Sequence, residues 1–466
     1  MRYISTRGQA PPASFKQAVM AGLAPDGGLY LPERVPDASG SLAQWQGLPF
    51  RPLFRQVGQR FAGDELSAGE LDALAGRAFA AFAHPDVTPV VKVGPLYMVE
   101  LFHGPTLAFK DVALQFLAAL FEQLLAESGR RMTVLGATSG DTGSAAMQAL
   151  RGRTGIEVFI LFPKGRVSPM QEYQMTTVPD ANVHAIAVEG SFDDAQDIVK
   201  RLFNDRAFNE RFRLGAVNSI NWARVMAQIA YFFYGYFRVL EREPGMKLGD
   251  PVLVSVPTGN FGHIYAAMLA RRMGLPVRRL ILSTNANGIL HRFVSTGTYR
   301  RGTVVPTYSP SMDIQVASNF ERYLHDLADG DAARVRGWMD ALNTEGGFAI
   351  DPALHARVQR ELVSSSVDDE TTLATIREFE SLHGYLLDPH TAVGVRGALD
   401  HAEPGIPTLA MATAHPAKFG AAIRAATGHD PPIPPALAGL ERLPRRVHTL
   451  PARVGPVQRY IAETLA

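Results

Sequence analysis

The segment from Leu101 to Asp111, LFHGPTLAFKD, places a lysine where its amine could act as a nucleophile. Strand-like residues 97–101 precede it and helix-like residues 108–125 follow, so Lys110 is predicted in the first turn of a helix. The helix dipole and burial beside Phe109 would both lower the pKa of the amine from about 10.4. A neutral amine can form a Schiff base with an aldehyde. Taken alone, the segment fits an ordinary first-turn lysine equally well.

Two glycine-containing segments are suited to binding anions. ATSGDTG (137–143) combines hydroxyl side chains with Gly140 and Gly143 before a predicted helix, whose first amides could bind a carboxylate. PTGNFG (257–262) also lies between a predicted strand and helix and is suited to a phosphate. In isolation, each could equally be a turn without a ligand. Neither is a Walker A or a GxGxxG sequence, so nucleotide hydrolysis and dinucleotide binding are poorly supported.

Other chemistry-bearing residue types give weaker signals. Thr413 ends a predicted strand in TAHPAKFG and, taken alone, is expected to be a helix cap. The chain has no cysteine, which excludes disulfides, thiolate metal sites and cysteine nucleophiles. Its 13 histidines include no HExxH pair, so we predict no metal site.

The elements that would position these segments alternate between strands and helices, which is typical of parallel α/β sheets. Ligands of such sheets bind beyond the carboxyl ends of the strands, where the segments above lie. The predicted strands are 132–137, 157–162, 183–188, 252–256, 279–283 and 408–412. The predicted helices are 143–150, 169–175, 193–203, 263–273, 368–379 and one from about 417.

The length of 466 residues suggests two or three domains. A net charge of +1 gives no reason to expect nucleic acid or an anionic membrane as a partner. The apolar run from Ile229 to Leu240 is too short to span a bilayer and is predicted to be a buried helix. The N-terminus has no apolar signal region, and we expect a cytoplasmic protein.

Four segments together resemble the threonine synthases: HGPTLAFKD, ATSGDTG, VPTGNFG and TAHPAKF, in that order and with similar spacing. SPSMDIQ, DDET and the N-terminal PDGGLYLP resemble the same family. The resemblance implies the α/β fold type II of pyridoxal phosphate (PLP) enzymes, with two open parallel-type domains and an N-terminal domain. The expected divisions are an N-terminal domain at 1–92, a PLP-binding region at 93–430 with a smaller domain inserted at about 130–240, and an extension at 431–466 packed on the large domain.

The resemblance also implies roles for individual residues. Lys110 matches the Schiff-base lysine, and Thr413 the hydroxyl residue that faces the pyridine nitrogen. The loop that cradles the cofactor phosphate corresponds to Gly259, Asn260, Phe261 and Gly262. The loop near the cofactor hydroxyl and the substrate carboxylate corresponds to Asp141, with Thr138, Ser139, Gly140 and Thr142 on the substrate side. For the substrate phosphate, charge alone suggests Lys164 and Arg166, although both could equally be solvated.

The implied reaction converts O-phospho-L-homoserine and water to L-threonine and phosphate, the last step of threonine biosynthesis. Lys110 is expected to transfer the protons, and the departing phosphate could assist the addition of water. One alternative is a PLP lyase that acts on another hydroxy- or phosphorylated amino acid. Another is a catalytically silent relative that binds small ligands. The expected assembly is a monomer or homodimer.

Overall fold

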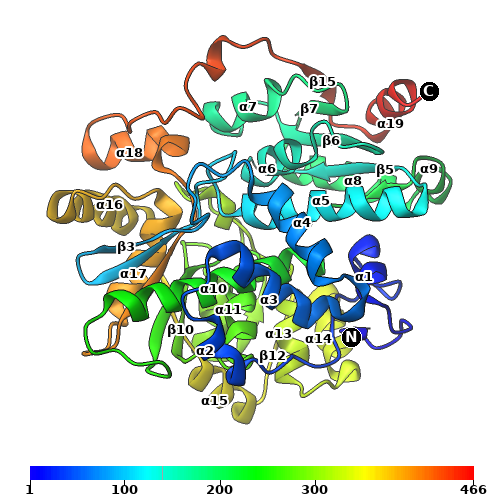
Figure 1. Cartoon of the computed structure of the whole chain (residues 1–466). Coiled ribbons are helices and arrows are strands. Elements are labelled where there is room, and N and C mark those ends of the chain that lie inside the picture. Colours follow the sequence, from blue (N-terminus) through cyan, green and yellow to red (C-terminus); the bar gives the residue numbers. More distant parts are fainter. Residues whose placement is uncertain (139) are drawn as a thin grey trace.

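The computed structural model describes residues 1–138 and 140–466, which form two large sheets and two two-stranded sheets with helices packed around them (Figure 1). The larger sheet has the strand order β13-β10-β9-β14-β4-β3 and is parallel except for the antiparallel pair β3–β4. Its strands are β3 (Val90–Val93), β4 (Leu96–Glu100), β9 (Val252–Pro257), β10 (Val277–Thr284), β13 (Leu362–Ser366) and β14 (Thr408–Ala412).

Helices cover both faces of the larger sheet. One face packs against α16 (Asp369–His383), α17 (Pro389–Asp400) and α18 (Gly420–Thr427). The other packs against α5 (Lys110–Ser128), α10 (Trp222–Arg242) and α11 (Gly262–Arg272). The remaining elements of this domain are α12 (Ile289–Thr296), β11 (Thr298–Arg300), α13 (Phe320–Leu327), α14 (Ala332–Thr344), β12 (Gly347–Ala349) and α15 (Pro352–Glu361).

The smaller sheet lies above the larger one in Figure 1, and four of its five strands are inserted in the chain between α5 and α10. All its strand pairs are parallel, in the order β15-β7-β6-β5-β8. The strands are β5 (Met132–Ala137), β6 (Ile156–Pro163), β7 (Val183–Glu189), β8 (Leu214–Gly215) and β15 (Val447–Pro451). The helices are α6 (Asp141–Leu150), α7 (Pro169–Thr176), α8 (Phe192–Asn204), α9 (Arg206–Phe212) and α19 (Val454–Thr464).

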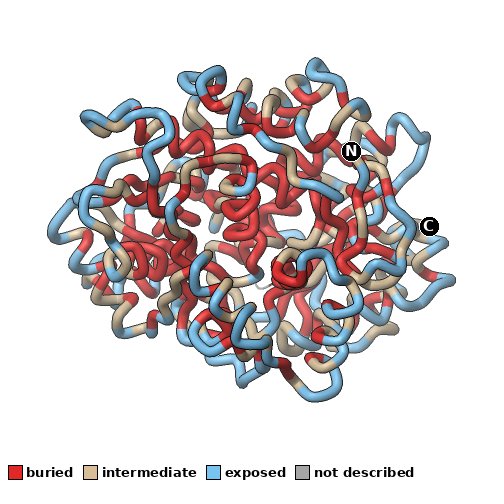
Figure 2. Tube along the Cα trace, turned by 90° about the horizontal axis from the view of Figure 1, so that it is seen from below, coloured by how far each residue is buried: buried red, intermediate tan, exposed pale blue. Residues whose placement is uncertain are grey.

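The N-terminal unit packs directly on the large domain and shares its hydrophobic core. Trp45 meets Phe233 of α10 with ring centroids 5.3 Å apart, and Phe54 meets Phe116 of α5 at 4.8 Å. Figure 2 shows buried residues throughout this interior and exposed residues along the peripheral turns. The elements of the unit are β1 (Tyr3–Ser5), α1 (Phe15–Ala21), β2 (Tyr30–Pro32), α2 (Leu42–Trp45), α3 (Phe50–Ala62) and α4 (Ala68–Phe79).

Most predicted elements are confirmed, with ends that shift by up to four residues, the largest shift being at the C-terminal end of α16. Ser168 caps α7 and Pro169 occupies its first position, as the sequence predicted. Helix α6 begins at Asp141, two residues before the predicted start. The helix predicted from about 417 is a short 3₁₀ turn, Pro416–Phe419, followed by α18. Among the described residues, no helix is both long and apolar enough to cross a membrane.

The expected packing of the extension at 431–466 on the large domain is wrong for its C-terminal part. Strand β15 pairs with β7, and α19 packs on α8, so residues 447–464 complete the inserted domain. The strand covers an edge of β7 that would otherwise expose unpaired backbone groups. The inserted domain is also smaller than predicted, because α10 packs on α3, α5 and α11 of the large body.

We predict that Ile461→Ala lowers the free energy of unfolding by about 2–5 kcal/mol, because the buried side chain of Ile461 fills the core between α19 and α8. Chemical denaturation measures the effect, with the exposed Glu463→Ala on the same helix as the control. Equal stability of the two variants would mean that the C-terminal helix is not part of the folded core.

Candidate active site

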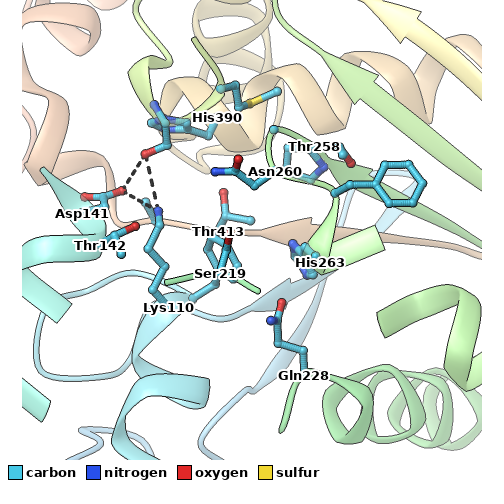
Figure 3. Close-up of a pocket in the computed structure, with 18 of the residues that line it drawn as sticks. Lys110, Asp141, Thr142, Ser219, Gln228, Thr258, Asn260, His263, His390 and Thr413 are labelled. Atoms are coloured by element: carbon cyan, nitrogen blue, oxygen red, sulfur yellow. Dashed lines mark hydrogen bonds and ion pairs between the residues drawn. The ribbon is translucent and has the colours of Figure 1, made fainter. Parts of the chain in front are cut away.

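A pocket lies beyond the carboxyl ends of the strands and is lined from both domains (Figure 3). Eight of the residues singled out in the sequence line it: Lys110, Asp141, Thr142, Gly259, Asn260, Phe261, Gly262 and Thr413. They come from the start of α5, the start of α6, the loop between β9 and α11, and the end of β14. The structure therefore brings together segments that lie about 300 residues apart in the chain.

Lys110 is the first residue of α5 and is only 8% exposed. The backbone before it runs beside the chain that follows β14, where the Phe109 amide donates to the Thr413 carbonyl at 2.8 Å. The Nζ atom lies 3.3 Å from Asp141 Oδ2 and 3.5 Å from Ser311 Oγ. Burial lowers the pKa of Lys110, and the charges of Lys418 and Arg224 act in the same direction, whereas Asp141 opposes the shift. These effects shift the protonation equilibrium of the amine toward its neutral, nucleophilic form.

The turn before Lys110 is held by Asp111. Its carboxylate accepts hydrogen bonds from the Thr106 amide at 2.8 Å and the Thr106 hydroxyl at 2.7 Å. A Cβ atom at Gly104 would overlap the Asp111 side chain, so only glycine fits this turn. The residues of HGPTLAFKD around the lysine therefore shape the loop that presents it.

Asp141 connects the inserted domain to the rest of the site. Its Oδ1 atom accepts from Lys418 Nζ at 2.8 Å and from Gln171 Nε2 at 3.0 Å, while Oδ2 faces Lys110. Burial alone would raise the pKa of Asp141, but the charges of Lys418 and Lys110 outweigh burial and hold it well below its ordinary range. Asp141 is therefore an ionised carboxylate between two amines, as Figure 3 shows for Lys110.

The loop between β9 and α11 has the shape of an anion cradle. Phe261 has a φ of +65°, and its ring packs on Phe320 behind the loop, with centroids 5.1 Å apart. A Cβ atom at Gly259 would lie 2.9 Å from the Ser311 carbonyl, so the backbone passes where a larger residue would not fit. The first amides of α11 have no partners within the helix and, with the helix dipole, favour an anion.

The far wall of the pocket carries Thr413 and His390. The Thr413 hydroxyl is buried and has no hydrogen-bond partner among the described residues, so it remains free for a ligand. His390 Nδ1 lies 2.9 Å from Asp388 Oδ1, and its Nε2 accepts from the Ser311 amide at 3.1 Å. This arrangement requires the proton on Nδ1 and fixes the orientation of the ring.

The other residues singled out in the sequence lie elsewhere. Thr138 Oγ1 accepts from the amides of Gly140 and Gly143, so Thr138 and Gly140 shape the turn before α6 and do not line the pocket. Lys164 and Arg166 are exposed and also do not line it; Lys164 Nζ lies 3.2 Å from Glu189 Oε1. The structure does not bring these two charges to the site. Ser139 lies outside the described residues.

Sequence reasoning missed several residues of the site. Lys418 lies in the segment TAHPAKF. A single lysine in a sequence is expected to be exposed to solvent, whereas the side chain of Lys418 is only 1% exposed. The segment at 309–324 was interpreted as structural, yet Ser311 and Met312 line the pocket. Outside the segments singled out in the sequence, the lining also includes Ser219, Arg224, Gln228, His263 and His390.

Comparisons with known proteins cover the whole chain. Residues 2–79 match the family described as threonine synthase N terminus, residues 84–359 match pyridoxal-phosphate dependent enzyme, and residues 391–461 match threonine synthase, C-terminal. Threonine synthase of Pseudomonas aeruginosa is 44% identical, with 99% of this chain and 98% of the relative aligned. Threonine synthase of Saccharomyces cerevisiae is 43% identical, with 90% and 88% aligned.

Solved structures agree with these sequence relationships. The crystal structure of PLP-bound threonine synthase from Brucella melitensis matches with a TM-score of 0.95 and 44% identity, covering 100% of this chain and 99% of the other. Threonine synthase from yeast matches with a TM-score of 0.94 and 40% identity, covering 100% and 98%.

We predict that Lys418→Met lowers the free energy of unfolding by about 3–5 kcal/mol, because it removes one cation from the buried Asp141 carboxylate. The double variant Lys418→Met/Asp141→Asn should recover most of this loss, since neither member of the pair is then left charged. Urea denaturation compares these proteins with the exposed Lys200→Met as control. If the double variant were no more stable than Lys418→Met, the unpaired Asp141 charge would not be the cause of the lost stability.

A second prediction concerns pH and His263. Burial lowers its pKa to about 3, and its ring stacks on Phe109 with centroids 4.8 Å apart. Below about pH 6.5 the unfolded chain takes up a proton at this residue but the folded chain does not, so stability falls as pH falls, by about 1.4 kcal/mol per pH unit. His263→Phe should remove this contribution from urea denaturation measured between pH 4.5 and 7.5. If the stability of His263→Phe depended on pH as steeply as that of the wild type, the result would contradict this prediction.

Proposed function

The chain belongs to the threonine synthase family, PLP-dependent enzymes that convert O-phospho-L-homoserine and water to L-threonine and phosphate, and we propose that the pocket around Lys110 carries out this reaction. The single observation that carries the proposal is the buried amine of Lys110, which faces a pocket with an anion cradle and an unpartnered hydroxyl. A lysine of lowered pKa in such a place suits covalent attachment of an aldehyde cofactor.

The residues present fit PLP. Lys110 would hold the cofactor covalently, and the loop Gly259–Gly262 would receive its phosphate at the start of α11. Thr413 would place its free hydroxyl against the ring nitrogen, which gives a use to a buried group that otherwise lacks a partner. When bound, the cofactor supplies an electron sink that makes protons on the substrate carbons acidic.

Lys110 is our candidate for the proton transfers. Its Nζ atom lies in a buried site that lowers its pKa, and once free it can accept a proton from a substrate carbon and return it. Asp141 and the Ser311 hydroxyl lie within 3.5 Å of Nζ and would orient it. Lys418 keeps Asp141 ionised and in place, so we assign Lys418 a positioning role.

The start of α6 is our candidate for the substrate carboxylate. Thr142 lines the pocket there, and Thr138 and Gly140 hold the turn that exposes the first amides of the helix. Ser139 is assigned to the same loop from the resemblance. A role for Lys164 and Arg166 at the substrate phosphate has no support from their exposed positions. A monomer or homodimer and a cytoplasmic location stay predictions.

The test is to supply purified enzyme and PLP with O-phospho-L-homoserine and to measure phosphate and threonine together. We expect equal amounts of both products from the wild type. Lys110→Ala should lower the rate by at least about 10³-fold because it removes both the attachment point and the proton carrier. The exposed Lys200→Ala serves as the control.

Parallel assays with serine and threonine as substrates separate the alternatives. Faster turnover of these free hydroxyamino acids than of O-phospho-L-homoserine would favour a different lyase. Threonine formation by Lys110→Ala near the wild-type rate would remove Lys110 from the mechanism, and no turnover of any substrate by the wild type would favour a silent relative.

A further inference from the structure

Asp388 and His390 form a buried pair that has no role in the steps above. They lie at the start of α17 and are 1% and 4% exposed. The Asp388 carboxylate caps this helix by accepting from the His390 and Thr391 amides at 2.9 and 3.2 Å, and its Oδ1 atom also lies 2.9 Å from His390 Nδ1. A helix cap needs only the carboxylate, so capping does not explain why an imidazole is held against it.

The other ring nitrogen of His390 holds the backbone of Ser311. Nε2 accepts a hydrogen bond from the Ser311 amide at 3.1 Å, which it can do only when the proton of the neutral ring is on Nδ1. Asp388 accepts the hydrogen bond from Nδ1 and thereby fixes this tautomer. The ring also packs on Phe419, with centroids 4.8 Å apart. The pair therefore connects the start of α17 to Ser311 through a ring of fixed orientation.

The turn that contains Ser311 is anchored on its other side by Asp313. The Asp313 carboxylate accepts from the Thr307 hydroxyl at 2.7 Å and from the Thr307 amide at 3.0 Å. The Ser311 carbonyl lies against the predicted phosphate loop, since a Cβ atom at Gly259 would be 2.9 Å from it. Residues 301–306, which precede the turn, are exposed. The turn is therefore held in a fixed position although the chain before it is open to solvent.

The Ser311 hydroxyl lies beside the amine of Lys110. It donates to Asp141 Oδ2 at 3.3 Å, which leaves its own lone pairs free to accept from Lys110 Nζ at 3.5 Å. Asp141 Oδ2 accepts from the same Nζ at 3.3 Å. A neutral amine has two N–H groups and one lone pair, so two acceptors together determine where the lone pair points. Reaction through that lone pair depends on its orientation toward the reacting atom.

We infer that Asp388 and His390 are a positioning pair, which holds the Ser311 hydroxyl in place and through it orients the lone pair of Lys110. This inference deepens the proposed function and rests on it for the identity of the reacting amine. The property of His390 that the site uses is then its hydrogen-bond acceptor at Nε2, and not its ring shape.

Two variants of His390 separate the acceptor from the ring. His390→Phe keeps a ring against Phe419 but offers the Ser311 amide no acceptor, whereas the side-chain carbonyl in His390→Gln can accept from it. We expect kcat to fall about tenfold in His390→Phe with KM within about twofold of wild type, and His390→Gln to recover most of the loss. His184→Phe is the matched control, because the His184 ring also stacks on a phenylalanine, at 4.4 Å, and does not line the pocket.

A double variant tests whether His390 acts through Ser311. Ser311→Ala should lower kcat about tenfold by itself, and adding His390→Phe should lower it by no more than about a further twofold. Losses that multiply to about a hundredfold would overturn the inference, because His390 would then act by another route. So would a kcat of His390→Phe within about twofold of wild type, or a His390→Gln variant as slow as His390→Phe.

Two further measurements need no turnover and still apply where His390→Phe fails to fold. Nitrogen NMR of isotope-labelled histidine, with the His390 signals assigned by their loss in His390→Gln, should place the ring proton on Nδ1; a proton on Nε2 would overturn the inference. The rate at which cofactor-free enzyme takes up PLP depends on the same lone pair, so it should fall about tenfold in Ser311→Ala and in His390→Phe.

The uptake rates also separate this inference from the proposed function. Rates within about twofold of wild type in both Ser311→Ala and His390→Phe would overturn the inference, whatever the enzyme does with its substrate. Wild-type enzyme that takes up PLP and forms no threonine would refute the proposed reaction, and tenfold slower uptake by the variants would leave the inference standing.

Discussion

The buried carboxylate of Asp141 is the contact on which the arrangement of the site depends. It lies at the start of α6 in the inserted domain, while Lys110 belongs to α5 and Lys418 to the turn after β14. One ionised group thus joins three segments of both domains, with nitrogen–oxygen distances of 3.3 and 2.8 Å. Since a buried charge is tolerated only with good partners, this contact strongly favours the relative position of the segments. The same contact places a carboxylate beside the amine proposed to do the chemistry.

The two lysines around Asp141 have different roles because their surroundings differ. Lys418 also donates to the Thr106 carbonyl at 2.8 Å, so its donors are used by the fold. Lys110 has only long contacts, at 3.3 and 3.5 Å, and burial together with two nearby cations favours its neutral form. A fixed ammonium and a reactive amine can therefore share one carboxylate. The Lys418 charge contributes to both effects, since it holds Asp141 ionised and lowers the pKa of Lys110.

The sequence predicted the parts of the site whose signals are local. Lys110 at a helix start and the glycine loop before α11 follow from strand–turn–helix patterns, which depend on neighbours in the chain. Lys418, Arg224 and Ser311 could not be found that way, because their burial arises from packing between distant segments. Strand β15 was missed for a related reason: residues 447–451 are intermediate or exposed, so they show no buried alternation, and pairing with β7 defines the strand.

The balance of charge in the pocket explains why the fold keeps so many buried polar groups. Lys418 and Arg224 bring positive charge, two helices direct their N-termini toward the site, and Asp141 is the carboxylate among the described lining residues. Without ligands, the protein groups around the pocket therefore carry an excess of positive charge, which is unfavourable in a buried space. Both ligands of the family's reaction carry a phosphate, and their binding would compensate this excess. Ligand binding and folding stability are therefore coupled, because anything that binds only the native state stabilises it. The charges of the site would thus be balanced only when its ligands are bound.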